Sequence, residues 1–301
     1  MTERYGPESL TVAIVSYNSR STIGRALDAL ARQTTLGFET LVIDSSDDGT
    51  EIQIAKLYPG ARLVHFAERH FPGKARNAAM RHRDRELIAF VDADCIAEPD
   101  WVERILAAHN DPANANRWII GGSVGVANPE STAGWASFFC EFSPWLRGGP
   151  SRPLTDIATC CYSMKRTAFE RFGPFVEDGY CSDTVFNWRA GAEGQSPLFV
   201  PGIHVRHINP TGMRRIAAKQ RMHGERFAGI RAREKRWSRS RSLFSAVTAP
   251  LLPLYLWVRT GLRVLRAPGY RKAFLRATPC LWCVSIAWSW GEARGYLRAA
   301  L

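Results

Sequence analysis

The sequence predicts an α/β protein with a mostly parallel sheet flanked by helices, followed by a C-terminal amphipathic helical region. Over the first hundred residues, apolar β-branched runs alternate with helical patterns, which is typical of a parallel sheet with helices on both faces. The charge pattern then divides the chain. Residues 1–213 hold 21 Lys and Arg against 25 Asp and Glu, a net of −4, whereas residues 214–301 hold 19 against 3, a net of +16. We therefore expect a globular domain over residues 1–225 and a basic helical region over residues 226–301.

The first half of the chain is expected to form four strands and three helices in alternation. Each strand is a short apolar run that ends on polar residues, and the first helix places Ile23, Leu27 and Leu30 on one face. The expected strands are 10–18, 38–46, 61–67 and 86–94, and the expected helices are 21–33, 47–59 and 73–84. Later elements are expected to be a helix at 101–110, a strand at 117–126, an irregular aromatic segment at 134–153, short helices at 165–172 and 183–191, and a strand at 197–210.

Polar residues follow three of these strands at the points where the strands end. They are Ser16, Tyr17 and Asn18 after the first strand, Asp44 after the second, and Asp92 and Asp94 after the fourth. In parallel sheets of this kind, ligands bind at the carboxyl ends of the strands. No Gly-rich phosphate loop follows the first strand, which argues against a dinucleotide-binding or P-loop enzyme. A diphosphate bound at this edge would therefore need a cation to neutralise it.

Asp92 and Asp94 are candidates for holding that cation. Side chains two residues apart on an extended chain point to the same face, and two neighbouring carboxylates repel each other unless a cation lies near them. A hard divalent ion, Mg²⁺ or Mn²⁺, suits oxygen ligands and also accepts diphosphate oxygens. Asp44, at the end of the neighbouring strand, is placed to accept hydrogen bonds from a nucleotide base. The alternative is that these acids are solvated loop residues or helix caps.

The chain resembles the family 2 glycosyltransferases, which have the GT-A fold, over roughly residues 10–230. The motifs "VAIVSYN", "LVIDSSDDGT", "GKARNAA" and "FVDADC" occur in the order found in that family. The later segments "FGPFVEDGYCSDTVFNWRAGAEG" and "FVPGIHVRHINP" continue the similarity. The resemblance implies metal-dependent transfer of a sugar from a nucleotide-sugar donor to an acceptor hydroxyl, with inversion at the anomeric carbon.

The resemblance also implies roles for individual residues. Asp183 is the candidate catalytic base, with Glu177 and Asp178 as competitors and a plain N-cap as the alternative. The family's acidic pair at this position is reduced here to Ser182-Asp183. The candidate metal ligands are Asp94, Asp92 and His207, whereas His204, three residues before His207 on a strand, points to the opposite face. The candidate donor-binding residues are Ser16, Tyr17, Asn18, Asp44, Lys74, Arg76, Asp92, Ala93 and Arg189. For Lys74 and Arg76 a solvated basic turn is the alternative, and for Arg189 a solvated helix face is the alternative.

The basic tail contains two uncharged apolar segments, 243–258 and 279–290. Both are shorter than the ~20 residues needed to span a bilayer. Basic residues border these Trp- and Leu-rich segments, which favours helices that lie in the headgroup layer of an anionic membrane. We therefore expect a peripheral or re-entrant protein at the cytoplasmic face of the cell membrane. Core helices or a dimer interface are the alternatives.

The remaining features bear on compartment and on competing functions. Seven cysteines without framework spacing indicate a reducing compartment, and residues 1–18 show no signal-peptide pattern. The expected acceptor is a glycan or a polyprenyl-linked saccharide. A nucleotidyltransferase acting on a sugar phosphate is the enzymatic alternative, since it would also use paired acids and a metal. A nucleic-acid-binding protein is the alternative from another class, but long apolar runs interrupt the basic tail, and we expect no nucleic-acid partner.

Overall fold

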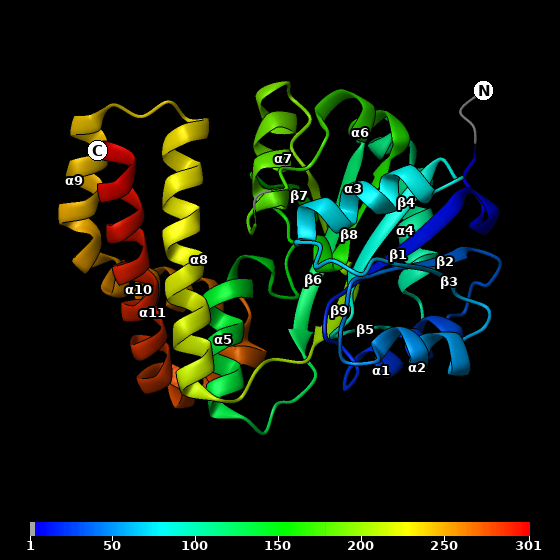
Figure 1. The fold of residues 1–301 in the computed structure, drawn as a ribbon, viewed down its shortest axis with the longest axis horizontal. Helices are drawn as coiled ribbons and strands as arrows, with labels where there is room; N and C mark the ends of the chain where they lie inside the picture. The colour runs from blue at the N-terminus through cyan, green and yellow to red at the C-terminus, as the bar shows by residue number, and fades with distance from the viewer. Residues whose placement is uncertain (1–3, 178) are drawn as a thin grey trace. The chain divides into compact units, whose positions relative to one another are not determined.

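The structure is a computed structural model that describes residues 4–177 and 179–301 (Figure 1). The chain forms two compact units. The first contains the residues up to Ala127 together with Pro150–Ile208, and the second contains Asn128–Gly149 and Asn209–Leu301. The domain boundary predicted at residue 225 falls inside one continuous helix, α8 (Met213–Glu234).

The first unit is built on a mixed sheet with the strand order β3-β2-β1-β4-β8-β6-β9-β5, and β7 pairs with β9. Strands β3, β2, β1 and β4 are mutually parallel, as predicted, whereas β8 runs antiparallel to both β4 and β6. The strands are β1 (Leu10–Ser16), β2 (Glu39–Asp44), β3 (Arg62–His65), β4 (Leu87–Asp92), β5 (Cys95–Ala97), β6 (Ile119–Val126), β7 (Arg152–Pro153), β8 (Tyr162–Lys165) and β9 (Leu198–His207). Strands β5, β7 and β8 were not predicted, because each is too short to show a period in the sequence.

The helices of the first unit follow the predicted order. They are α1 (Ile23–Ala31), α2 (Thr50–Leu57), α3 (Pro72–His82), α4 (Trp101–Asn110), α6 (Arg166–Phe172) and α7 (Ser182–Ala192). The central strands are fully buried, and residues such as Val12, Ile14 and Val42 have no exposed surface. Their continuous apolar runs are typical of parallel strands covered on both faces.

The strand register places the polar residues at one edge of this sheet. Ser16 pairs with Asp44 across β1 and β2, and Val15 pairs with Asp92 across β1 and β4. At the other end of the sheet order, Cys95 of β5 pairs with His207 of β9 in an antiparallel ladder. Since β5 begins three residues after Asp92, the turn between β4 and β5 brings the end of β9 to the end of β4.

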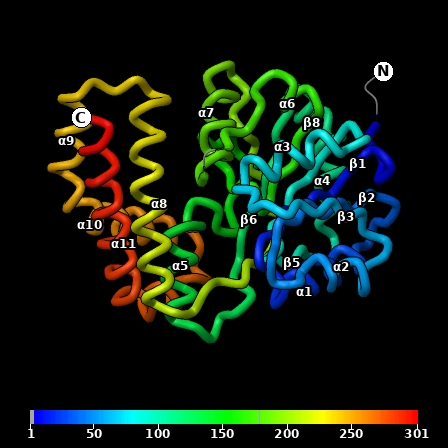
Figure 2. The backbone as a smooth tube through the Cα atoms, in the orientation of Figure 1, coloured from blue at the N-terminus to red at the C-terminus, as the bar shows by residue number. Residues whose placement is uncertain are grey.

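The second unit is helical and contains α5 (Thr132–Phe142), α8, α9 (Arg239–Thr248), α10 (Leu252–Leu265) and α11 (Arg271–Ala300). Helix α11 packs along α8 at small residues (Figure 2). A Cβ atom on Gly291 would lie 2.0 Å from the carbonyl oxygen of Arg221, and one on Gly295 would lie 2.3 Å from that of Glu225. Glycine at these two positions therefore permits the close helix contact.

Two sequence expectations in this unit need correction or refinement. The aromatic segment expected to be irregular forms α5 over its first half, because its rings pack within the unit. Phe139 lies edge-on to Phe274 of α11, with the ring centroids 5.5 Å apart. Pro250 lies in a short 3-10 turn between α9 and α10, where the sequence predicts a kink.

Candidate active site

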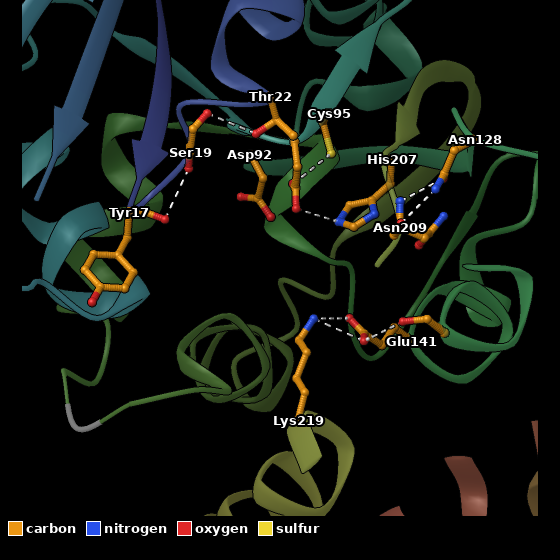
Figure 3. Close-up of polar contacts among 12 residues, drawn as sticks. Tyr17, Ser19, Thr22, Asp92, Cys95, Asn128, Glu141, His207, Asn209 and Lys219 are labelled. Atoms are coloured by element: carbon orange, nitrogen blue, oxygen red, sulfur yellow. Dashed lines mark hydrogen bonds and ion pairs between the residues drawn. The ribbon is translucent and has the colours of Figure 1, made fainter. Parts of the chain in front are cut away.

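Two of the three side chains predicted to hold a cation, Asp94 and His207, face each other where β4, β5 and β9 meet, and the third, Asp92, is beside this pair at the end of β4. Figure 3 shows Asp92, Cys95 and His207 in this region. Asp92 ends β4, Asp94 lies in the following turn, and His207 ends β9. The Nε2 atom of His207 is 3.3 Å from Oδ2 of Asp94, and the backbone carbonyl of Asp94 accepts a hydrogen bond of 2.8 Å from Ile208. The ligand atoms of Asp94, Cys95 and His207 all lie within 4.8 Å of one another. A backbone hydrogen bond thus connects the end of β9 to the turn that contains Asp94.

Asp92 carries an uncompensated oxygen atom. Its Oδ1 is buried and accepts no hydrogen bond among the described residues, and Nη2 of Arg76 lies 3.9 Å away. The pKa of Asp92 is raised to about 6: burial raises it most, the positive charges of Arg76 and His207 partly offset this, and the neighbouring Asp94 adds to the rise. A buried carboxylate oxygen without a donor is unfavourable. The site is therefore electrostatically suited to a bound cation.

Arg76 connects this acidic turn to helix α7. Its side chain is 7% exposed, and Nη1 donates a hydrogen bond of 2.8 Å to Oγ of Ser182. In the resembled family an acidic pair occupies this position, where Ser182 replaces one of the two acids. The hydroxyl group of Ser182 therefore holds the arginine that faces Asp92. The alternative of a solvated basic turn is wrong for Arg76. Lys74, two residues earlier, is half-buried, and its donor contact stays a prediction.

Asp183 lies in the first turn of α7 but is not the N-cap residue, which is Cys181 in a left-handed conformation. Its Oδ2 accepts hydrogen bonds from Oγ1 and the backbone N–H of Thr159, at 3.2 and 3.4 Å, and its Oδ1 accepts one from the N–H of Thr184. The charge of Asp183 contributes to the raised pKa of Asp92. Asp183 therefore acts electrostatically on the acidic turn, which the N-cap alternative does not provide.

The competitors of Asp183 are placed differently. Oε1 of Glu177 accepts a hydrogen bond of 2.8 Å from Nδ2 of Asn77 on α3, which ties the segment before α7 to that helix. Asp178 lies outside the described residues. Gly73 makes this contact possible, because a Cβ there would lie 1.9 Å from the carbonyl oxygen of Val176.

The residues after β1 and β2 form a second polar group. Asp44 is fully buried, and its carboxylate accepts hydrogen bonds from the Oγ (2.6 Å) and N–H (3.0 Å) of Ser46 and lies 2.8 Å from Nδ1 of His65. Ser46 Oγ in turn accepts a hydrogen bond of 2.8 Å from the N–H of Asn18, which has a positive φ of 51°. Asp44 therefore organises the loops at this edge, and direct contact with a base stays a prediction. His65 was missed because a single strand histidine gives no signal in the sequence.

The other predicted donor residues have varied surroundings. Tyr17 is 36% exposed and lies under the guanidinium of Arg69, at 4.1 Å from the ring centroid. Ser16 and Ala93 are buried, and Ser16 Oγ has no hydrogen-bond partner among the described residues. Arg189 donates a hydrogen bond of 3.0 Å to the carbonyl of Pro174, which favours a role in orienting α7.

His204, the other histidine of β9, faces a different partner from His207, as expected from their spacing. Nδ1 of His204 lies 2.8 Å from Oγ of Ser123 on β6, away from the partners of His207.

The donor atoms at the turn fit a divalent cation with oxygen and nitrogen ligands. Asp92 has a buried oxygen without a hydrogen-bond donor, and Asp94 and His207 already face each other. The third member of the group, Cys95, is buried, and burial raises its thiol pKa well above its usual value. A protonated thiol is a poor ligand for a hard cation, so the Asp94 carboxylate and the His207 imidazole are the members of this group that fit the cation, with the Asp92 carboxylate next to them.

The fold and this site define a nucleotide-sugar transferase of the GT-A type. The family model described as "Glycosyl transferase family 2" matches residues 11–173, and the chain belongs to this family. The chain is therefore a glycosyltransferase, and the nucleotidyltransferase and nucleic-acid-binding alternatives do not describe its catalytic unit. The predicted fold class and family resemblance are confirmed.

Known proteins similar to this chain include validoxylamine A glucosyltransferase of Streptomyces hygroscopicus subsp. jinggangensis, which is 34% identical over 112 residues, covering 35% of this chain and 26% of that protein. The succinoglycan biosynthesis protein ExoO of Rhizobium meliloti is 32% identical over 99 residues, covering 32% and 28% of the two chains. The chain thus spans between a quarter and a third of these relatives' length. Among solved structures, the mannosyltransferase PcManGT from Pyrobaculum calidifontis, in complex with GDP-Man and Mn²⁺, superposes with a TM-score of 0.64 at 19% identity, covering 95% of this chain and 88% of that one.

Proposed function

We propose that the protein transfers a sugar from a nucleotide-sugar, with inversion and with the help of a divalent cation, to a hydroxyl group of a glycan or a lipid-linked saccharide. The observation that carries the proposal is the contact of Asp94 with His207 next to Asp92, one of whose buried oxygens no N–H or O–H satisfies in the described part of the chain. The family assignment and the GDP-Man and Mn²⁺ of a protein with the same fold support it. The imidazole ligand favours Mn²⁺ over Mg²⁺, because Mg²⁺ is held mainly by oxygen.

The residues of the site have separate tasks in this mechanism. Asp94 and His207 would hold the cation, Asp92 would add its negative charge next to it on the side of the donor, and Arg76 would keep Asp92 ionised. When bound, the cation supplies positive charge next to the diphosphate leaving group as the glycosidic bond breaks. Asp183 accepts the proton of the acceptor hydroxyl, whose oxygen forms the new bond to the anomeric carbon while the diphosphate departs with the electron pair.

The cation assignment is tested by product analysis with labelled nucleotide-sugars. Asp94→Ala and Asp92→Ala should each reduce turnover at least about 100-fold, as should removal of divalent cations with a chelator. Asp84→Ala is the matched control, because that side chain is 75% exposed and forms a salt bridge with Arg62, away from the acidic turn. Sugar transfer releases a nucleoside diphosphate rather than pyrophosphate. Full activity of both site variants would overturn the cation assignment.

The base assignment has its own test. Asp183→Asn removes the proton acceptor but keeps a side chain of the same size in the first turn of α7. We expect loss of transfer with unchanged donor affinity by calorimetry. Unchanged turnover would move the assignment to Glu177 or Asp178.

We also propose that the second unit attaches to an anionic membrane surface through α9 and α10. In the described residues, one helical stretch, Arg239–Leu265, is long and apolar enough to cross a membrane, and only 22% of its apolar window is buried. Its exposed apolar residues recur at helical spacing along one face. They are Phe244, Val247, Leu251, Leu254, Tyr255, Val258, Leu262 and Leu265.

Exposed arginines border this apolar face at both ends, with Arg239 and Arg241 before it and Arg266 after it. Each could add about 1 kcal/mol near an anionic surface. Val247→Glu should abolish co-sedimentation with vesicles that contain phosphatidylglycerol, while Leu57→Glu on α2, also exposed, should leave it unchanged. Equal sedimentation of both variants would contradict membrane attachment through this face.

A further inference from the structure

Asp156 is an acid that the sequence does not single out and that the mechanism above does not use. It lies in the segment between β7 and β8, and both of its carboxylate oxygens are held by α7. Oδ2 accepts a hydrogen bond of 2.9 Å from Oγ1 of Thr184, and Oδ1 accepts one of 2.7 Å from Nδ2 of Asn187. Thr184 follows Asp183 directly and donates its own N–H to Asp183. One residue thus contacts both carboxylates.

Asn187 fixes this arrangement from the other side. It is fully buried, donates a second hydrogen bond of 3.0 Å to the carbonyl of Ile157, and accepts one of 3.0 Å from the hydroxyl of Tyr162 on β8. Because both oxygens of Asp156 are bound to rigid partners, the carboxylate has little freedom to turn away from α7. The fold therefore fixes the position of the Asp156 carboxylate relative to Asp183, so any electrostatic repulsion between them persists.

The charge state of Asp156 changes near neutral pH. The pKa of Asp156 is raised to about 7: burial and the Asp183 carboxylate raise it, and the hydrogen bonds from Asn187 and Thr184 and the one at Ile157 partly offset them. The other titratable groups that sense Asp156 are Tyr162 and Cys181. Burial raises the pKa of Tyr162 well above its usual value and that of Cys181 to about 12, so both are neutral at pH 7. Asp92, on which Asp183 also acts, has a pKa of about 6 and is mostly ionised at pH 7. Above pH 7, the charge near Asp183 that changes most is therefore the charge of Asp156.

We propose that ionised Asp156 is a positioning residue that makes Asp183 a stronger base. This inference rests on the proposed role of Asp183. In the transition state, the acceptor proton moves from the hydroxyl oxygen to Asp183, which removes one of two like charges. The repulsion from Asp156 is relieved at that moment, so the ionised form of Asp156 favours proton transfer. Protonated Asp156 keeps the same place in the fold but provides no such repulsion.

The experiment is the pH dependence of kcat for wild type and Asp156→Asn, with saturating donor, acceptor and Mn²⁺. In the wild type, kcat should rise through an inflection near pH 7. Asp156→Asn is nearly isosteric and uncharged, so it should lack this inflection. The two enzymes should have similar kcat at pH 6, and the variant should be about three- to tenfold slower at pH 8.5, because it lacks the Asp156 charge that favours proton transfer.

A second variant keeps the test decisive if Asp156→Asn fails to fold. Thr184→Val removes one hydrogen bond that lowers the pKa of Asp156, so the inflection should move to higher pH. A wild-type profile without an inflection between pH 6 and 8, or a pH-independent ratio between wild type and Asp156→Asn, would overturn the inference. Asp183→Asn separates the two proposals. If this variant retains transfer, the base assignment fails and this inference fails with it. If it loses transfer but the kcat ratio between wild type and Asp156→Asn does not change with pH, only the role of Asp156 is overturned.

Discussion

Replacing Asp92 by Asn should stabilise the cation-free protein while it removes the activity. Burial raises the pKa of this carboxyl group from 3.8 to about 6. The folded protein therefore favours the protonated form of Asp92. The stability that this form contributes is fully present below about pH 3.8 and is lost as the pH rises through about 6. A shift of two pKa units corresponds to about 3 kcal/mol, and we expect about 1–2 kcal/mol, since the side chain is 31% exposed and solvent screens the charge. The gain should be absent near pH 4 and complete above pH 6.5.

A divalent cation should reverse this ranking. Mn²⁺ at about 100 times its dissociation constant stabilises a protein that binds it by about 2.7 kcal/mol. Wild type should gain this amount, and Asp92→Asn should lose most of it. The assay is thermal unfolding at pH 7.5 with and without Mn²⁺, in which each kcal/mol corresponds to a change in Tm of about 2–4 °C. The variant should melt at the higher temperature without Mn²⁺ and at the lower temperature with it.

The matched control is Asp84→Asn, whose side chain is 75% exposed, and which should behave like wild type in both conditions. The reasoning would be refuted if Asp92→Asn melted below wild type without the cation, because the buried oxygen would then be satisfied. It would also be refuted if Mn²⁺ raised the Tm of both proteins equally.

Three further predictions follow from named contacts. Arg76→Met should weaken Mn²⁺ binding about tenfold at pH 7 by calorimetry, because Asp92 loses the positive guanidinium group that faces it. Arg81→Met, at an exposed position on the same helix, should not weaken Mn²⁺ binding. His109→Gln should reduce the loss of stability at acidic pH. Burial lowers the pKa of His109 to about 3, so below pH 6.5 the unfolded wild-type chain takes up a proton that the folded protein does not. This lowers the free energy of unfolding by about 2 kcal/mol at pH 5, as measured in urea titrations. Gly73→Ala should destabilise the protein by at least about 2 kcal/mol in the same titrations, because its Cβ would meet a backbone oxygen; Gly60→Ala, with open space around it, is the control.

Local patterns in the chain predict much of the catalytic unit. The alternation of apolar runs and helical patterns predicts β1 to β4 and their parallel order, since a parallel strand buried on both faces needs a continuous apolar run. The i, i+2 spacing of Asp92 and Asp94 predicts that both lie at the end of β4, and the order of motifs predicts the family. His207 and Asp183 were named from the resemblance, and the structure brings His207 within 3.3 Å of Asp94.

Other features of the site depend on pairings between distant segments and leave no local signal. Arg76 faces Asp92 only because α3 and α7 meet at Ser182. Asp44 is engaged by His65 because β3 adds to the sheet beside β2. Short strands such as β5, with three residues, form because β9 offers a partner, and no period is visible in so short a segment.

The residue order thus predicts the fold class, the acidic edge and the kind of chemistry, because periodicity, charge and short-range spacing are local properties. The tertiary structure adds the electrostatic state of each group. Whether an aspartate is a solvated cap, a cation ligand or the neighbour of a base depends on burial and on the charges that other segments bring to it. Asp156 illustrates the difference: in the sequence it is one acid in a loop, and in the fold both of its oxygens are bound to the helix that carries Asp183.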